Sequence, residues 1–274
     1  MTDDANTTPV SPYDPLYLAE QRILGTFGDG VSITSKKKTL LKFGRFDDLG
    51  ASYETVWSQG GNETYVTTNA IDTASSSSSD DTEVLYIEGH TVSGTGTDAQ
   101  FTFVAQTATL AGTGKVVLDT PLARVSRVYN ISSTTLVGDV YISEDDTHTT
   151  PGVPNTAAKI HMKLEAGENQ SYKASTTFSN NDYFICTGGW GSVNKKTSAT
   201  VDFEMQVRRP GQLFLPVARI SAASAGLANV SISFDPPVIV PKNSDIRVQA
   251  RASTTAVEVN AAFQGYLASI YKRA

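Results

Sequence analysis

Hydrophobic and polar residues alternate along much of the chain after residue 53. In TVDFEMQVR, residues 200–208, the side chains of Val201, Phe203, Met205 and Val207 fall on one face and the polar side chains between them on the other. The stretches KIHMKL, DIRVQARA and AVEVNAAF repeat this period of two. Such alternation is typical of antiparallel strands that have one face on a core and one face in water.

About a dozen short stretches of this kind lie between residues 51 and 274, separated by turn residues, and none of them has a sustained helical stripe. No repeat of 20–50 residues is present, which argues against a propeller or a solenoid. The sequence therefore predicts an all-β fold, an antiparallel β-sandwich or jelly roll over residues 51–274. A possible subdivision lies near residue 195, in the polar stretch NKKTS.

The sequence pattern of residues 1–50 differs from that of the rest of the chain. They begin with the polar stretch MTDDANTTPVSP, continue with YDPLYLAEQRIL and end in a basic run. This segment has too little apolar surface to fold alone, so it is predicted to be an extended N-terminal arm that docks on another surface. Its expected apolar anchors, and hence its assembly contacts, are Tyr13, Leu16, Tyr17 and Leu18.

Five serines, Ser75 to Ser79, lead into Asp80 and Asp81 and then into an apolar strand. Strand candidates on both sides have the same composition, so the run is predicted to be a loop between strands and not a linker between domains. The two aspartates are expected to cap backbone N–H groups. Neither this cluster nor the acidic stretch at residues 144–146 has the spacing of a calcium loop.

The formal charge is −6 and the pI about 5.1. This balance argues against nucleic acid as a partner, although the run Lys36, Lys37, Lys38 is followed by Lys42, Phe43, Arg45 and Phe46 in a short basic patch. The patch is compatible with docking on an acidic protein surface and with a solvated edge strand. No apolar run approaches the length of a membrane span, and no segment has the pattern of a signal peptide, so synthesis in a cytoplasm is expected.

Catalytic and metal-binding patterns are absent from the sequence. The three histidines, His90, His148 and His161, have no metal-ligand spacing, and His161 is expected at the surface because it lies on the polar face of its strand. The single Cys186 excludes an intramolecular disulfide and is expected in the core. AGTGKVV lacks the residues of a phosphate-binding loop and predicts a hairpin turn. We therefore expect no enzymatic activity, no cofactor and no metal.

Two tryptophans leave a second function open, the recognition of carbohydrate. Trp190 lies in GGWGS, which predicts a glycine-rich loop with an exposed ring, and Trp57 could join it in a platform that stacks on sugars. Aromatic side chains at the rim of a sandwich are also common as plain packing.

The serine run followed by Asp-Asp-Thr, and then by a strand ending in Ile87-Glu88-Gly89, resembles a pattern in structural proteins of tailed, especially marine, bacteriophages. The hairpin around Gly112, the arginine-rich strand RVSRV and the closing FQGYL resemble the same proteins. The resemblance covers about residues 55–270 and leaves the arm uncovered.

The resemblance implies a virion component, assembled in the cytoplasm of a bacterial host. We expect an auxiliary capsid protein of the decoration or cement type that forms a homotrimer and binds the major capsid protein or other virion proteins through its arm. The alternatives are a neck or tail component and a carbohydrate- or receptor-binding module in which Trp190 contacts the ligand.

Overall fold

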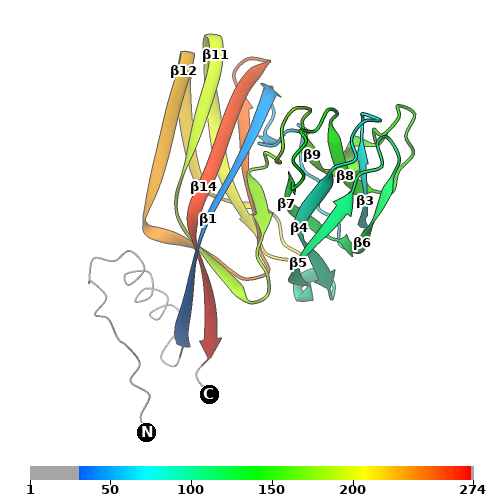
Figure 1. Cartoon of the computed structure of the whole chain (residues 1–274). Coiled ribbons are helices and arrows are strands. Elements are labelled where there is room, and N and C mark those ends of the chain that lie inside the picture. The colour runs from blue at the N-terminus through cyan, green and yellow to red at the C-terminus, as the bar shows by residue number, and fades with distance from the viewer. Residues whose placement is uncertain (1–30, 273–274) are drawn as a thin grey trace.

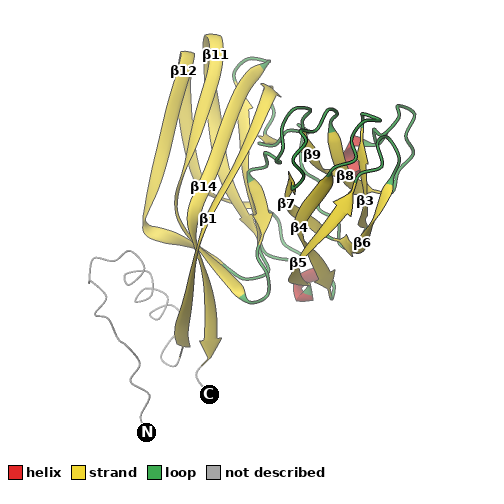
Figure 2. Ribbon diagram, viewed as in Figure 1, coloured by secondary structure: helices red, strands yellow, loops and turns green. Residues whose placement is uncertain are grey.

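The structure is a computed structural model and describes residues 31–272; within them the side chains of residues 31–37, 195–197, 224–226 and 269–272 are left undescribed. The chain there forms a large and a small β body that lie side by side (Figure 1). Within residues 31–272 all pairs of named strands are antiparallel, and helix is confined to the 3₁₀ turns Gly96–Asp98 and Ala157–Lys159 (Figure 2). The predicted all-β antiparallel fold is confirmed, because alternation fixes which face of each strand can be buried.

The large body contains seven strands in the order β1-β14-β11-β13-β10, with β12 on β11 and β2 on β13. Their bounds are β1 Val31–Leu49, β2 Glu54–Thr55, β10 Ser175–Thr177, β11 Asp182–Arg208, β12 Leu215–Val240, β13 Asp245–Ala252 and β14 Val257–Lys272. The four longest, β1, β11, β12 and β14, form the tall sheet on the left of Figure 1.

The large body is a sandwich of two layers, and the strands β11 and β12 pass through both of them. Residues 182–194 of β11 pair with β14, whereas residues 201–208 pair with β13, and the register shifts between Lys195 and Ala199. β12 follows β11 along its whole length. The two halves of β11 face each other, because a Cβ added to Gly191 would lie 2.8 Å from the Phe203 ring.

Residue 195, where the sequence left a subdivision open, thus lies where the chain crosses between the layers. Val193 and Val201, on either side of the crossing, belong to one core cluster. That cluster also contains Phe263 of β14 and Ala250 of β13, which come from the two layers. The alternation predicted for residues 200–208 is confirmed, since Val201, Phe203 and Met205 are buried in it.

The small body consists of a four-stranded sheet, β6-β3-β8-β9, packed on a three-stranded sheet, β5-β4-β7. The strands are β3 Ile71–Ser76, β4 Val84–Ser93, β5 Gln100–Thr109, β6 Val116–Leu122, β7 Arg124–Asn130, β8 Val140–Glu144 and β9 Ile160–Leu164. A second core cluster fills the space between them, with Ile71, Leu85, Ile87, Val128 and Ile142 fully buried. The AGTGKVV segment forms a turn between β5 and β6, but not the predicted hairpin, because the two strands belong to different sheets of the small body.

The serine run is partly a strand and partly a loop. Ser75 and Ser76 end β3 and are fully buried, and the chain then turns toward Asp81, whose side chain is also buried. The Asp81 carboxylate accepts hydrogen bonds from the backbone N–H groups of Val137 (2.7 Å) and Gly138 (3.0 Å). The capping role expected of Asp81 is confirmed, whereas Asp80 remains exposed.

The structure assigns the second part of the predicted arm to the large sheet. Val31–Leu49 is β1 and pairs with β14 from Val31 to Leu49, so these residues are a sheet strand and not an extended arm. The sequence had left an edge strand open for the basic run with Lys36, Lys37, Lys38 and Lys42, and β1 lies at the edge of the sheet. Of these, Lys42 is buried and not solvated, since it lies where the small body meets β1.

Candidate functional site

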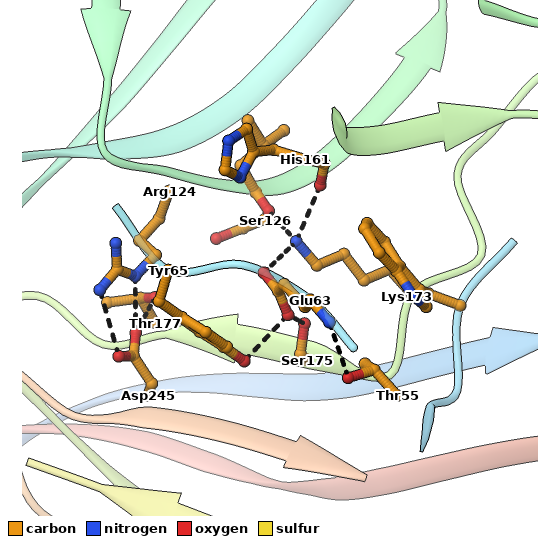
Figure 3. A network of polar contacts seen from close by, with 12 residues as sticks. Thr55, Glu63, Tyr65, Arg124, Ser126, His161, Lys173, Ser175, Thr177 and Asp245 are labelled. Atoms are coloured by element: carbon orange, nitrogen blue, oxygen red, sulfur yellow. Dashed lines mark hydrogen bonds and ion pairs between the residues drawn. The ribbon is translucent and has the colours of Figure 1, made fainter. Parts of the chain in front are cut away.

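A network of buried polar side chains occupies the junction of the two bodies, and Figure 3 shows it at close range. The backbone joins the bodies here, because the N–H of Lys173 donates to the Phe43 carbonyl of β1 (3.0 Å) and the N–H of Ala174 donates to the Val56 carbonyl (2.9 Å). The segment before β10 therefore lies against the edge strand β1. This places the side chain of Lys173 between the large and the small body.

Lys173 is 1% exposed and forms an ion pair with Glu63, with 2.5 Å between Nζ and Oε1. Its ammonium group also donates to the carbonyls of Val125 in β7 and His161 in β9, both at 3.0 Å. The ring of Trp57 lies beside it, 5.5 Å from Nζ to the ring centroid. One cation thus binds groups of both bodies and has every ammonium donor engaged.

Glu63 receives further hydrogen bonds from Ser175 (2.6 Å) and from the hydroxyl of Tyr65 (2.9 Å). Burial raises the pKa of this carboxyl, but the charge of Lys173 and the hydrogen bonds outweigh burial and hold the pKa below its ordinary value. The same burial, together with the negative charge of Glu63, raises the pKa of Tyr65 well above its ordinary value. Glu63 is therefore a carboxylate and Tyr65 a phenol at neutral pH.

A second ion cluster lies beside the first. Arg124 of β7 binds Asp245 of β13 through two guanidinium nitrogens, at 3.0 and 3.3 Å, and Arg208 of β11 binds the same carboxylate. Thr177 donates to Asp245 at 2.6 Å. Burial raises the pKa of Asp245, but the two arginines lower it further than burial raises it. The small body is thereby joined to the large sheet by a forked, charge-assisted contact.

An open cleft of about 520 Å³ lies next to the network, between β1, β10 and the strands β4, β5 and β7. The Lys42 ammonium group at its wall donates to the Ser126 carbonyl. Burial, reinforced by the positive charges of Lys173 and Arg127, lowers the pKa of Lys42 to about 7. Burial also lowers the pKa of His90, another wall residue, to about 4.

The chemistry of this arrangement is structural. The carboxylates of Glu63 and Asp245 are saturated by cations and hydroxyl donors, so neither has an exposed lone pair with which to act as a base on a substrate. Among residues 31–272, no three His, Cys, Asp or Glu side chains gather where they could hold a metal ion. The described residues likewise contain no helix long and apolar enough to cross a membrane.

The residues singled out in the sequence have different outcomes. Tyr13, Leu16, Tyr17 and Leu18 lie outside the described residues. Trp190 is 39% exposed, but it lies within strand β11, paired with Ser231 and Ala262, and not in the glycine-rich loop that GGWGS predicted. Trp57 is buried at the network, so the two tryptophans do not form one platform.

Among the remaining candidates, Cys186 is fully buried in the core, as predicted. The prediction for His161 was wrong: it is 2% exposed, although it lies on the polar face of its strand. The reason is that this face of β9 is covered, with His161 Nε2 3.2 Å from Glu144 and the His161 backbone against Lys173.

Sequence reasoning missed Glu63, Lys173 and Asp245. They lie far apart in the chain, and each is a single charged residue within an ordinary polar stretch. Arg124 and Asp245 lay in segments that had been singled out, RVSRV for its resemblance and DIRVQARA for its alternation, but neither for its charge. No local signal marks such residues, because the pairing partners come from different strands and meet only in the folded chain.

No known protein family matches the chain, and no curated protein matches it. Weak structural similarity exists to chains of infectious bursal disease virus. The Gt strain chain aligns with a TM-score of 0.19 and 10% identity over 88% of this chain and 73% of that one. The Gx strain chain gives 0.21 and 8% over 90% and 79%, and a crystal structure of the VP2 subviral particle gives 0.18 and 9% over 90% and 78%. TM-scores near 0.2 do not amount to a shared fold.

Proposed function

We propose that this chain is a non-enzymatic structural protein of a virion, an auxiliary capsid protein of the decoration or cement type. It would associate with copies of itself and bind the major capsid protein or other virion proteins. The motifs within residues 55–270 that resemble phage structural proteins support the virion as its place.

The buried ion network is the observation that carries the non-enzymatic part. Four buried charged groups, Lys173, Glu63, Arg124 and Asp245, form ion pairs where the two β bodies meet. A buried pair of this kind adds little net stability over an apolar contact, but it is costly to break, so it favours one relative orientation of the bodies. A fixed orientation suits a subunit that must present the same surfaces in every copy.

Cementing would work by mass action. A protein that binds only the assembled shell lowers the free energy of that state and raises the temperature at which the shell comes apart. The contacts proposed for this step are Tyr13, Leu16, Tyr17 and Leu18, whose apolar side chains would become buried on a neighbouring subunit. Both core clusters of the described residues are built from side chains that follow these positions in the sequence.

The test uses the full chain and purified phage particles whose genome encodes it. Mass spectrometry of the particles should detect the chain at many copies, and particles reconstituted without it should lose DNA at a lower temperature. Replacing all four aromatic and leucine anchors by serine should lower occupancy on the shell while the far-ultraviolet spectrum stays that of the wild type. A matched control replaces Val117, which is 75% exposed on the small body, by serine.

Three outcomes would redirect the proposal. Absence of the chain from purified particles would overturn a virion role. Presence at a few copies per particle would move the assignment to the neck or tail, because those structures use few subunits. Glycan binding that is lost in Trp190→Ala would support the receptor-binding alternative.

A further inference from the structure

β12 presents a long edge of the sandwich that the described chain leaves unpaired. This strand runs from Leu215 to Val240 and, within residues 31–272, pairs only with β11. Its other side therefore carries a row of backbone N–H and C=O groups that are directed away from the sheet. Rows of this kind bind another strand unless the protein blocks them.

The opposite edge of the same sandwich is blocked in several ways. β1 contains lysines at 36, 37, 38 and 42 and two register shifts against β14. Backbone hydrogen bonding from Lys173 and the buried Lys42 contact attach the small body to it. Charge, irregularity and cover are the means by which natural proteins prevent edge pairing.

Along its middle β12 lacks charged residues, and no described residue covers its outer edge, although its register against β11 shifts between Ser224 and Gly226. Arg219 and Asp235 are its two charged residues, and its prolines, at 216, 236 and 237, lie near the two ends. Inward-facing side chains such as Ile220, Ile232 and Phe234 are only partly covered, and a gap of about 30 Å³ opens beside them between the layers. On the outer face Leu215 and Leu227 are 62% and 73% exposed.

We propose that the β12 edge pairs with the β12 edge of a second copy of this chain, about a two-fold axis that runs along the strands. β12 passes up one layer of the sandwich and down the other, as its pairing with both halves of β11 requires. A two-fold rotation about such an axis therefore sets the first half of one β12 beside the second half of the other. The two halves run antiparallel, so both layers continue across the contact.

Charge selects the register of this pairing. If Leu227 meets Leu227 of the second copy, Arg219 lies opposite Asp235 of the second copy, and both charged residues of the strand face an opposite charge. The same register keeps the prolines at the ends of the paired region. Odd-numbered residues from 217 to 223 and from 227 to 233 are exposed, so the outer faces of the two copies match as well. Arg219 also binds Glu204 of its own chain, which holds its side chain on this face.

The inference names the surface for the self-association proposed above, and it stands independently of a virion role. It predicts an even number of copies, and so differs from the trimer expected from the sequence. A dimer has a mass of twice 29.2 kDa, which light scattering on a sizing column separates from one or three copies.

Two matched double variants test the register. Ala223 and Ser231 are exposed residues that lie opposite each other between copies, but within one chain they pair with different halves of β11. Ala223→Lys/Ser231→Lys sets lysine against lysine twice per dimer, whereas Ala223→Glu/Ser231→Lys sets glutamate against lysine. The lysine-only variant should dissociate at a concentration at least about tenfold higher than the glutamate–lysine variant.

Equal dissociation of the two variants would overturn the register, and a wild-type monomer at every accessible concentration would overturn the pairing. Leu227→Cys gives a second readout, because residues directly opposite on antiparallel strands are close enough for a disulfide. Under mild oxidation it should give covalent dimers, while Val117→Cys, equally exposed but on the small body, should not. Dimers that vanish when residues 1–30 are deleted, with the Leu227→Cys cross-link absent, would assign the contact to the N-terminal segment instead.

Discussion

The sulfur atoms of Cys186 and Met205 lie 4.0 Å apart, although both residues belong to β11 and are separated by 19 positions. An extended strand of that length would hold them roughly 60 Å apart. The strand must therefore turn back on itself, which it does where its register shifts between Lys195 and Ala199. One strand thereby supplies both layers of the sandwich, and β12 follows it around the same bend.

The close approach of Gly191 to Phe203 makes this arrangement testable. Gly191→Ala should lower the free energy of unfolding by about 1–3 kcal/mol, because the added methyl group overlaps the Phe203 ring. Phe203→Leu in the same chain should restore part of the loss, and urea unfolding of the single and double variants gives the coupling energy. Gly50→Ala is the control, since a Cβ there has no neighbour nearer than 3.7 Å. Additive effects at 191 and 203 would contradict the facing layers.

Removing one partner of the ion pair between Lys173 and Glu63 should lower the free energy of unfolding more than removing the charge of both partners. Lys173→Met leaves Glu63 as an unpaired buried carboxylate, so the free energy of unfolding should fall by about 3–5 kcal/mol. Lys173→Met/Glu63→Gln removes the uncompensated charge and should be clearly more stable than the single variant. Urea titration at pH 7 measures both.

An exposed ion pair provides the comparison. Lys115 binds Asp145 at the surface, with side chains 37% and 71% exposed, and Lys115→Met should cost no more than about 1 kcal/mol. A loss as small as this in Lys173→Met would mean that the network does not join the two bodies.

Lys42 should make the protein less stable at neutral pH than in mild alkali. Its pKa is about 7 in the folded chain against an ordinary value of 10.5, so between these values the unfolded chain binds more protons than the folded one. Stability due to this group therefore rises with pH from about 7 to 10.5 and is lowest below pH 7. Lys42→Met should be more stable than the wild type at pH 6, by more than about 1 kcal/mol. Urea titrations at pH 6, 8 and 10 should show this advantage shrinking, and a constant difference would show that Lys42 stays charged.

The buried carboxylate after the serine run should matter more than its neighbour. Asp81→Ala leaves the N–H groups of Val137 and Gly138 and the hydroxyl of Ser76 without their acceptor, at a cost of about 2–4 kcal/mol. Asp80→Ala, on the adjacent exposed residue, should stay within about 0.5 kcal/mol of the wild type. Thermal unfolding followed by circular dichroism compares the two, and similar losses would mean that the loop has no anchor at Asp81.

The sequence by itself determined the class of fold and much of its detail. Alternation of period two is a local property, so the strand of Val201, Phe203 and Met205, the turn around Gly112 and the buried Cys186 were all predictable from a few neighbouring residues. That Asp81 accepts hydrogen bonds from backbone N–H groups was predictable from its place in a polar turn. Its partners Val137 and Gly138 were not, because they lie 56 and 57 positions away in the chain.

Only the tertiary structure decided which strands lie beside which. It placed His161 in a covered junction despite its polar face, made a sheet strand of the lysine-rich segment at residues 31–49, and brought Glu63 to Lys173 and Arg124 to Asp245. It also left β12 with one edge unpaired. These features depend on contacts between residues tens to more than a hundred positions apart. Such contacts are set by how the strands pair and pack, which leaves no mark on the local pattern.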